Sequence, residues 1–150
     1  MPSIADAVPL YGRPRHARPL LVGHGLAVAA LVVLTVATAS VGTQQWFDEA
    51  YNVVLPAVAF VLPVVVGVAS AALGGGLVPT LALGAAPSLA WTVAVVLGRA
   101  LGTLLGTPLP IPDSPLWAIA SAFLVIGLAG AFGGFLAGRV GRFAWRRLVA

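Results

Sequence analysis

Four long uncharged apolar runs constrain the fold of this chain more than any other feature of its 150 residues. The core of a lipid bilayer is about 30 Å thick, and roughly 20 apolar residues in a helix cross it. The runs cover residues 20–42, 53–73, 77–98 and 116–138. Because lipid offers no partner to the backbone, each run must pair its own N–H and C=O groups, as a helix does. The sequence predicts an all-α polytopic membrane protein, with four transmembrane helices arranged as two hairpins in a domain spanning residues 20–138.

The composition agrees with this fold and removes most chemistry. Charged residues make up 8% of the chain, against roughly 25% in soluble domains. The chain has no cysteine, which excludes disulfides and thiolate metal sites. Its histidines and carboxylates form no metal-ligand cluster, and no serine has a recognisable base nearby. We therefore expect no enzymatic activity, no cofactor and no metal.

The arginines predict how the chain is oriented. They lie in short tails beside the first and last apolar runs, while the acidic residues Asp48, Glu49 and Asp113 fall in the opposite loops. Positively charged flanks mark the cytoplasmic side of a membrane protein, so residues 1–19 and 139–150 are both expected in the cytoplasm, with the protein in the cell membrane. The basic residues adjoin apolar spans and form no basic folded domain, so nucleic acid is not expected as a partner. The tail arginines are Arg13, Arg15, Arg18, Arg139, Arg142, Arg146 and Arg147.

The C-terminal segment "RVGRFAWRRLVA" has the pattern of an interfacial helix. Arg139, Arg142 and Arg146 share one helical face, and Phe143 and Trp145 can enter the membrane interface. Such a segment is expected to lie along the inner leaflet and to bind anionic lipid headgroups, with Arg147 contributing. At the other terminus, arginines before an apolar run also suggest a signal peptide, but the run at 20–42 exceeds the usual 7 to 15 apolar residues.

Arg99 is the one charge placed near the middle of an apolar stretch, in "VVLGRALGTLLG". A helix that starts near Pro79 rises about 30 Å before it reaches Arg99, which puts the guanidinium at the outer interface. Its aliphatic stem could then lie along the helix while its charge reaches headgroups. The alternative is a functional charge inside the membrane, which a helix continuing to Gly106 would favour.

Glycines at four-residue spacing predict close helix packing. One ladder comprises Gly98, Gly102 and Gly106, and the other comprises Gly130, Gly134 and Gly138. Helices in lipid associate where small residues let the backbones approach. Small residues near Ser70 and Gly74 should lie at the same depth as the second ladder, so the two could pack together. The ladders resemble a glycine zipper, and they serve either packing within the chain or self-association into a homo-oligomer or larger membrane complex.

Two prolines and one histidine are the remaining candidates for a transport path. Pro63 and Pro87 lie inside apolar runs and free the carbonyl groups of Ala59 and Leu83. Broken helices at matched depth are typical of transport sites, although neighbouring helices also accommodate simple kinks. His24 lies inside the first run and could relay a proton or hydrogen-bond another helix. Together with Arg99, these residues define a possible path.

The arginine-only basic residues, the Ala/Val/Gly-rich runs, the absence of cysteine and the "GGG" at 74–76 resemble small four-span membrane proteins of halophilic archaea. The resemblance lies in the composition and general pattern of the whole chain and rests on no specific motif. It implies a location and a fold but no activity. We therefore expect a non-enzymatic structural or accessory membrane protein. A small transporter or channel protomer is the alternative.

Overall fold

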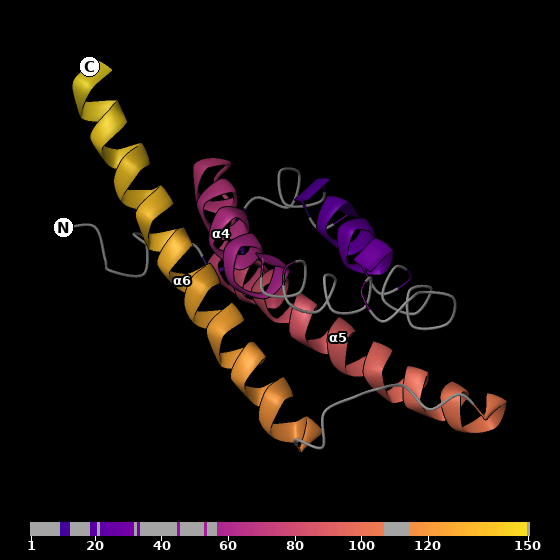
Figure 1. The fold of residues 1–150 in the computed structure, drawn as a ribbon. Coiled ribbons are helices and arrows are strands. Elements are labelled where there is room, and N and C mark those ends of the chain that lie inside the picture. Colours follow the sequence, from indigo (N-terminus) through magenta and orange to yellow (C-terminus); the bar gives the residue numbers. More distant parts are fainter. Residues whose placement is uncertain are drawn as a thin grey trace.

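Figure 1 shows the computed structural model of the chain. The described residues are 10–12, 19–20, 22–31, 33, 45, 53, 57–106 and 115–149. Their elements are a helix at Val22–Leu31, the π-helical segment η2 (Ala57–Val61), α4 (Leu62–Ala72), α5 (Leu77–Leu105) and α6 (Leu116–Val149). Within these residues there is no strand, so the expectation of an all-helical protein is confirmed. The predicted N-terminal arginines and the acidic outer loops lie outside the described residues.

Two of the helices are long and apolar enough to cross a membrane. The 29 residues of α5 and the 34 residues of α6 correspond to about 43 Å and about 51 Å of helix. The helices at Val22–Leu31 and Ala57–Ala72 are shorter than a full span. Parts of the predicted runs 20–42 and 53–73 lie outside the described residues, so the structure supplies two of the four predicted spans.

Both long helices continue beyond the boundaries expected from the sequence. α5 ends at Leu105, past Gly98, and Gly106 terminates it with a φ of 69°, the left-handed conformation that glycine commonly supplies at a helix C-terminus. α6 runs unbroken through Gly138 to Val149, so the predicted tail 139–150 is not separated from the span by a break. A glycine inside a helix costs only about 1 kcal/mol, and no proline follows Pro115 to stop α6.

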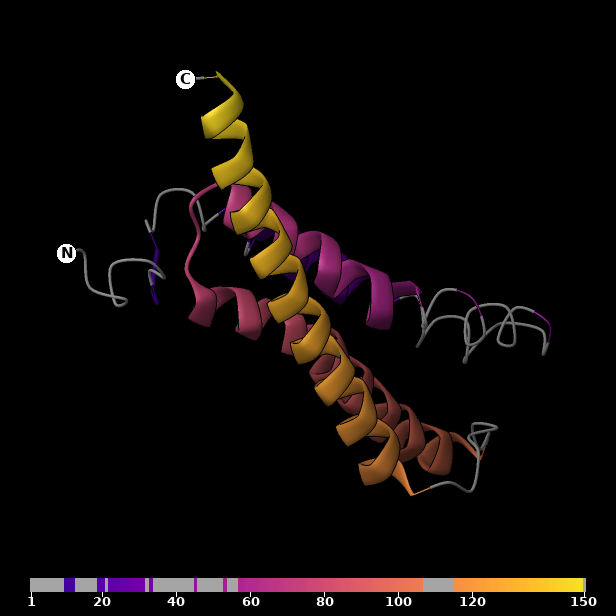
Figure 2. The ribbon, with the colours of Figure 1, turned by 90° about the vertical axis from the view of Figure 1, so that its left-hand side faces the viewer.

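The two predicted helix breaks are accommodated differently. Pro63 has no N–H for the carbonyl of Ala59, and the chain just before it is π-helical and changes to α-helix at Leu62. Pro87 lies inside α5, which continues on both sides of it. Figure 2 shows α5 curving along its length, as a helix with an interior proline does.

Close backbone contact joins α6 to its two neighbours. α4 and α6 run in the same direction, since Val64 lies against Gly134 and Val68 against Gly138. A Cβ atom added to Gly138 would lie 2.7 Å from the carbonyl oxygen of Val68, and one added to Gly134 would collide with that of Val64. Closer to the start of α6, a Cβ added to Gly84 of α5 would lie 2.7 Å from the Gly127 carbonyl oxygen. Only glycine fits at these contacts.

Aromatic rings fill the space where the three helices are farther apart. Phe123 of α6 meets Trp91 of α5 and Phe60 of η2 edge to face, with ring centroids 5.4 Å and 6.2 Å apart. Each such pair contributes about 0.5–1.5 kcal/mol beyond the area that it buries. The glycine contacts and the aromatic cluster therefore join the same helices at different positions along the bundle.

Adjacent glycines of α6 provide a matched test of this packing. Gly134→Ala should lower the free energy of unfolding by about 1–3 kcal/mol, because the added methyl overpacks the contact with Val64. Gly133→Ala should leave it unchanged or raise it by up to about 1 kcal/mol, because nothing lies within 4 Å of the added Cβ and alanine favours helix. Unfolding of the purified protein in detergent micelles measures both. Equal effects of the two substitutions would contradict the contact.

Candidate functional site

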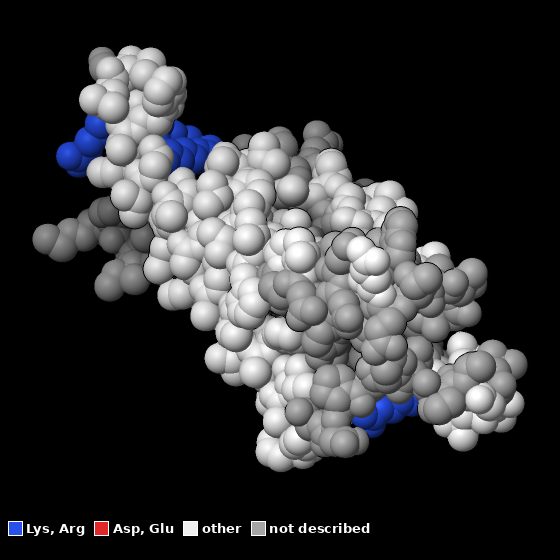
Figure 3. Space-filling view, viewed as in Figure 1, with Lys and Arg blue, Asp and Glu red and all other residues white. Residues whose placement is uncertain are grey.

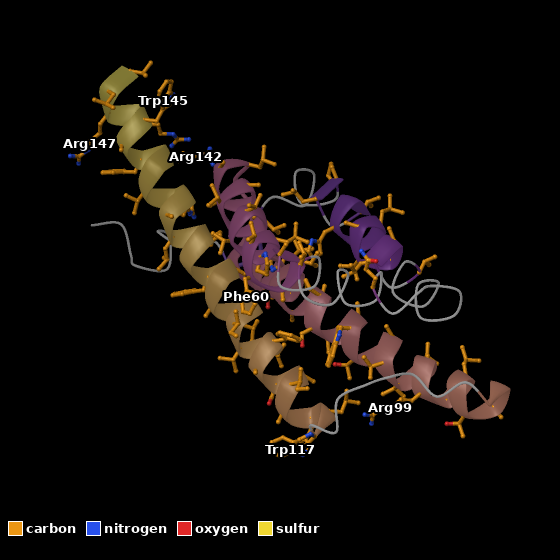
Figure 4. All side chains as sticks on the ribbon, in the orientation of Figure 1. Phe60, Arg99, Trp117, Arg142, Trp145 and Arg147 are labelled. Atoms are coloured by element: carbon orange, nitrogen blue, oxygen red, sulfur yellow. The ribbon has the colours of Figure 1, made fainter. Side chains whose placement is uncertain are left out.

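The described charges lie at the two ends of the bundle and not along its sides. In Figure 3 the blue arginine atoms occur near the C-terminal end of α6 and at the opposite end of the molecule, and the described residues between them on this face are white. Figure 4 places Arg99 and Trp117 at one end and Arg142, Trp145 and Arg147 at the other. The stretch of α6 from Trp117 to Arg139 is about 33 Å long, close to the thickness of a bilayer core.

Arg99 lies near the C-terminal end of α5, and its side chain is exposed. α6 begins at Leu116, which packs against Trp91 and Val95, so Arg99 lies about one turn beyond the level at which α6 starts. α5 does continue past it, and the Thr103 hydroxyl donates to its carbonyl oxygen over 2.8 Å. Yet about 18 Å of helix separate Arg99 from Pro87, so the structure does not bring this charge to the other residues of the possible path.

Two arginines near the end of α6 lie over phenylalanine rings, and a third reaches a neighbouring turn. The guanidinium carbon of Arg139 lies 5.6 Å from the centroid of the buried Phe135 ring, and that of Arg147 lies 4.4 Å from the Phe143 ring. Arg142 reaches across to the turn between α4 and α5, where a Cβ on Gly74 would be 3.3 Å from its Nη1 atom. A cation there is favourable because the C-terminus of α4 carries partial negative charge. Arg146 and Arg147 are exposed.

A segment near the N-terminus packs on the same turn, which the sequence did not predict. The N–H of Val78 donates to the carbonyl of Leu10 over 3.0 Å, and Gly12 pairs with Gly75. A Cβ on Gly76 would lie 2.5 Å from the backbone nitrogen of Gly12. Gly74 has a φ of 77°, and a Cβ on Gly75 would collide with Ser70 of α4, so the turn itself requires these two glycines. Gly76 was the available signal, because its missing side chain leaves room for a second backbone.

Two buried hydroxyls form a chain beneath this turn. Thr80 Oγ1 donates to the Gly76 carbonyl over 2.7 Å, and therefore accepts the proton of Ser70 Oγ, 2.6 Å away. Deeper in the bundle, Ser88 Oγ donates to the carbonyl of Ala120 over 2.9 Å. The buried hydroxyls of the described residues are thus satisfied within the protein, and none faces a base that could activate it.

His24 is the exception among the buried polar side chains. It is 6% exposed, and its ring lies within reach of the main chain of Leu83. This approach falls short of full hydrogen-bond geometry at either ring nitrogen. Pro63 is buried elsewhere, with its Cβ 3.5 Å from the position of a Cβ on Gly130. The structure thus brings His24 to the break made by Pro87, but it does not bring Arg99 there.

The two glycine ladders have different environments. Gly134 and Gly138 contact the backbone of α4 within the chain, and Gly130 faces Val64 across a looser contact. Gly98 and Gly102 are buried. Gly106 is not a packing position, because it ends α5 and a Cβ added to it would meet nothing within 4 Å. Its left-handed conformation explains why a glycine stands there.

The described residues define an all-helical protein with two helices of membrane-spanning length, and they contain no group of three metal-ligating side chains. The chain matches no family model, no curated protein and no solved structure.

The hydroxyl chain predicts a difference between two threonines that make the same local bond. Thr80→Val should lower the free energy of unfolding by about 1–3 kcal/mol, because the Ser70 hydroxyl and the Gly76 carbonyl lose their partner in a buried place. Thr103→Val should change it by less than about 0.5 kcal/mol, because this hydroxyl also bonds a carbonyl four residues earlier but is exposed. Detergent unfolding measures both variants. An equally small effect at Thr80 would contradict a role in stability for the hydrogen bonds between Ser70, Thr80 and Gly76.

Proposed function

We propose that this chain is a non-enzymatic multi-pass protein of the cell membrane with a structural or accessory role. In this proposal it crosses the bilayer four times, and both tails are cytoplasmic. Its partners are membrane lipids, with anionic headgroups bound at the inner face by Arg139, Arg142, Arg146 and Arg147.

The observation that carries the proposal is the placement of small and large apolar residues. Glycine and alanine occupy the contacts between α4, α5 and α6, while many of the large apolar side chains face outward. Val125 and Leu136 of α6 are 64% and 45% exposed, and Val93 and Leu101 of α5 are 54% and 47% exposed. A contiguous apolar exterior of this kind is rare in water, whereas in lipid helices associate through small residues.

The polar ends of the bundle also support the membrane proposal. Trp117 is 75% exposed at the start of α6 and Trp145 is 68% exposed near its end. Tryptophan and arginine are enriched where a membrane meets water. The arginine-to-phenylalanine contacts at Phe135 and Phe143 would keep charge and ring together at that level. Arg99 then serves as an outer anchor, as its distance from Pro79 predicts.

The interior favours packing over transport. A transport path needs polar groups along a wetted route, and the buried hydroxyls at Ser70, Thr80 and Ser88 are already paired with protein atoms. The alternative of a small transporter rests on His24, whose ring nitrogens lack a full hydrogen bond. Self-association through Gly134 and Gly138 would require α4 to leave, since α4 covers them.

Single cysteines test the proposal directly, because the chain has no native cysteine. Leu148, Leu104 and Val125 are 82%, 81% and 64% exposed. The proposal puts Leu148 in the cytoplasm, Leu104 outside the cell and Val125 in lipid. In sealed vesicles, a membrane-impermeant thiol reagent should label Leu148→Cys from the cytoplasmic face only and Leu104→Cys from the outer face only. Val125→Cys should react from neither face, although it should react fully after denaturation.

The decisive comparison is between Val125→Cys and the two end positions. Labelling of Val125→Cys from both faces at the rate of Leu148→Cys would show that the apolar face meets water and would overturn the membrane proposal. Labelling from one face only would instead indicate a wetted path and favour the transporter.

A further inference from the structure

The helix at Val22–Leu31 turns a polar residue toward the bundle. His24 is buried, and Val28 and Leu31 are partly buried, whereas Val22, Gly23, Gly25 and Leu26 are exposed. The inward positions are spaced four and three residues apart, as on one face of a helix. His24 is therefore the most deeply buried described residue of this helix. Burying an imidazole without hydrogen bonds is unfavourable, so its location requires a partner.

The residue that it faces has an unusual backbone group. The carbonyl of Leu83 would normally accept from the N–H of residue 87, but that residue is Pro87, which has none. Leu83 is itself 5% exposed, so solvent does not reach this carbonyl freely. In membrane helices such freed carbonyls are satisfied by neighbouring helices or by side chains. The ring of His24 lies within reach of this same main-chain group.

We propose that His24 attaches the N-terminal helix (Val22–Leu31) to α5 by a hydrogen bond. Its acceptor is the Leu83 carbonyl, which Pro87 leaves without a donor within the helix. The carbonyl can only accept, so the neutral imidazole must present an N–H to it, which fixes one tautomer. A small rotation of the ring completes the bond. Pro87 thereby provides a polar attachment point on an otherwise apolar helix, and this role does not depend on the function proposed above.

The test measures whether removal of either partner releases the helix. Spin labels at Leu26 and Val93, which are 65% and 54% exposed, report the distance between the N-terminal helix and α5 in detergent or lipid. His24→Leu removes the donor, and Pro87→Ala restores a backbone N–H that occupies the carbonyl. Each should broaden the distance distribution, and the double variant should broaden it no further. Pro79→Ala is the matched control, because it also removes a proline from α5 but supplies no N–H to the Leu83 carbonyl.

Nitrogen NMR of the histidine ring tests the bond without destabilising the protein. In a His16→Gln background, His24 should show a single tautomer with a hydrogen-bonded N–H, and Pro87→Ala should convert it to a mixture. Unchanged distances in both His24→Leu and Pro87→Ala, additive broadening in the double variant, or a tautomer signal unaffected by Pro87→Ala would overturn the proposal.

Discussion

The contact between the backbones of α4 and α6 is the constraint on which the rest of this structure depends. At Gly134 and Gly138 the neighbouring carbonyl groups of Val64 and Val68 leave no space for a Cβ atom. Helices that approach so closely gain dispersion contacts along both backbones. They also leave little room for large side chains between them, so many of the valine and leucine side chains of these helices lie on the outside.

This distribution determines the surroundings that the protein can tolerate. A helix that buries glycine and exposes leucine gains little from the hydrophobic effect in water, but in lipid it packs as well as any other. The length of the uncharged surface, bounded by Arg99 and Trp117 at one end and by Arg142 and Trp145 at the other (Figure 4), corresponds to a bilayer core. Close packing, an apolar exterior and charged ends are thus consequences of one arrangement.

Much of the fold could be predicted because its signals are local. The uncharged runs predicted α5 and α6, and the four-residue spacing of glycines in α6 indicated its packing face. The chemistry of Pro87 identified the freed carbonyl of Leu83 before any neighbour was known. The continuation of α6 beyond Gly138 was missed because the boundary was placed at a change in charge, and a change in charge does not by itself end a helix.

Other features depend on how separate segments meet, and no short pattern carries them. The hydrogen bond between Ser70 and Thr80 requires a particular rotation of α4 against α5. The packing of Leu10 and Gly12 on the glycine turn requires two distant backbones to fit each other. The approach of His24 to Leu83 depends on tertiary packing, because no sequence pattern favours α5 over any other helix as the neighbour of His24.

A nitroxide scan of α6 in liposomes tests the central claim most directly, which is that this helix lies in lipid with its glycine face covered. Labels at the outward positions Val125, Phe132 and Leu136 should be accessible to oxygen and shielded from a polar nickel reagent, with the contrast strongest near the middle of the helix. Labels beyond Arg147 should show the reverse. Uniform access of the nickel reagent along α6 would contradict the account, because it would place the apolar exterior in water.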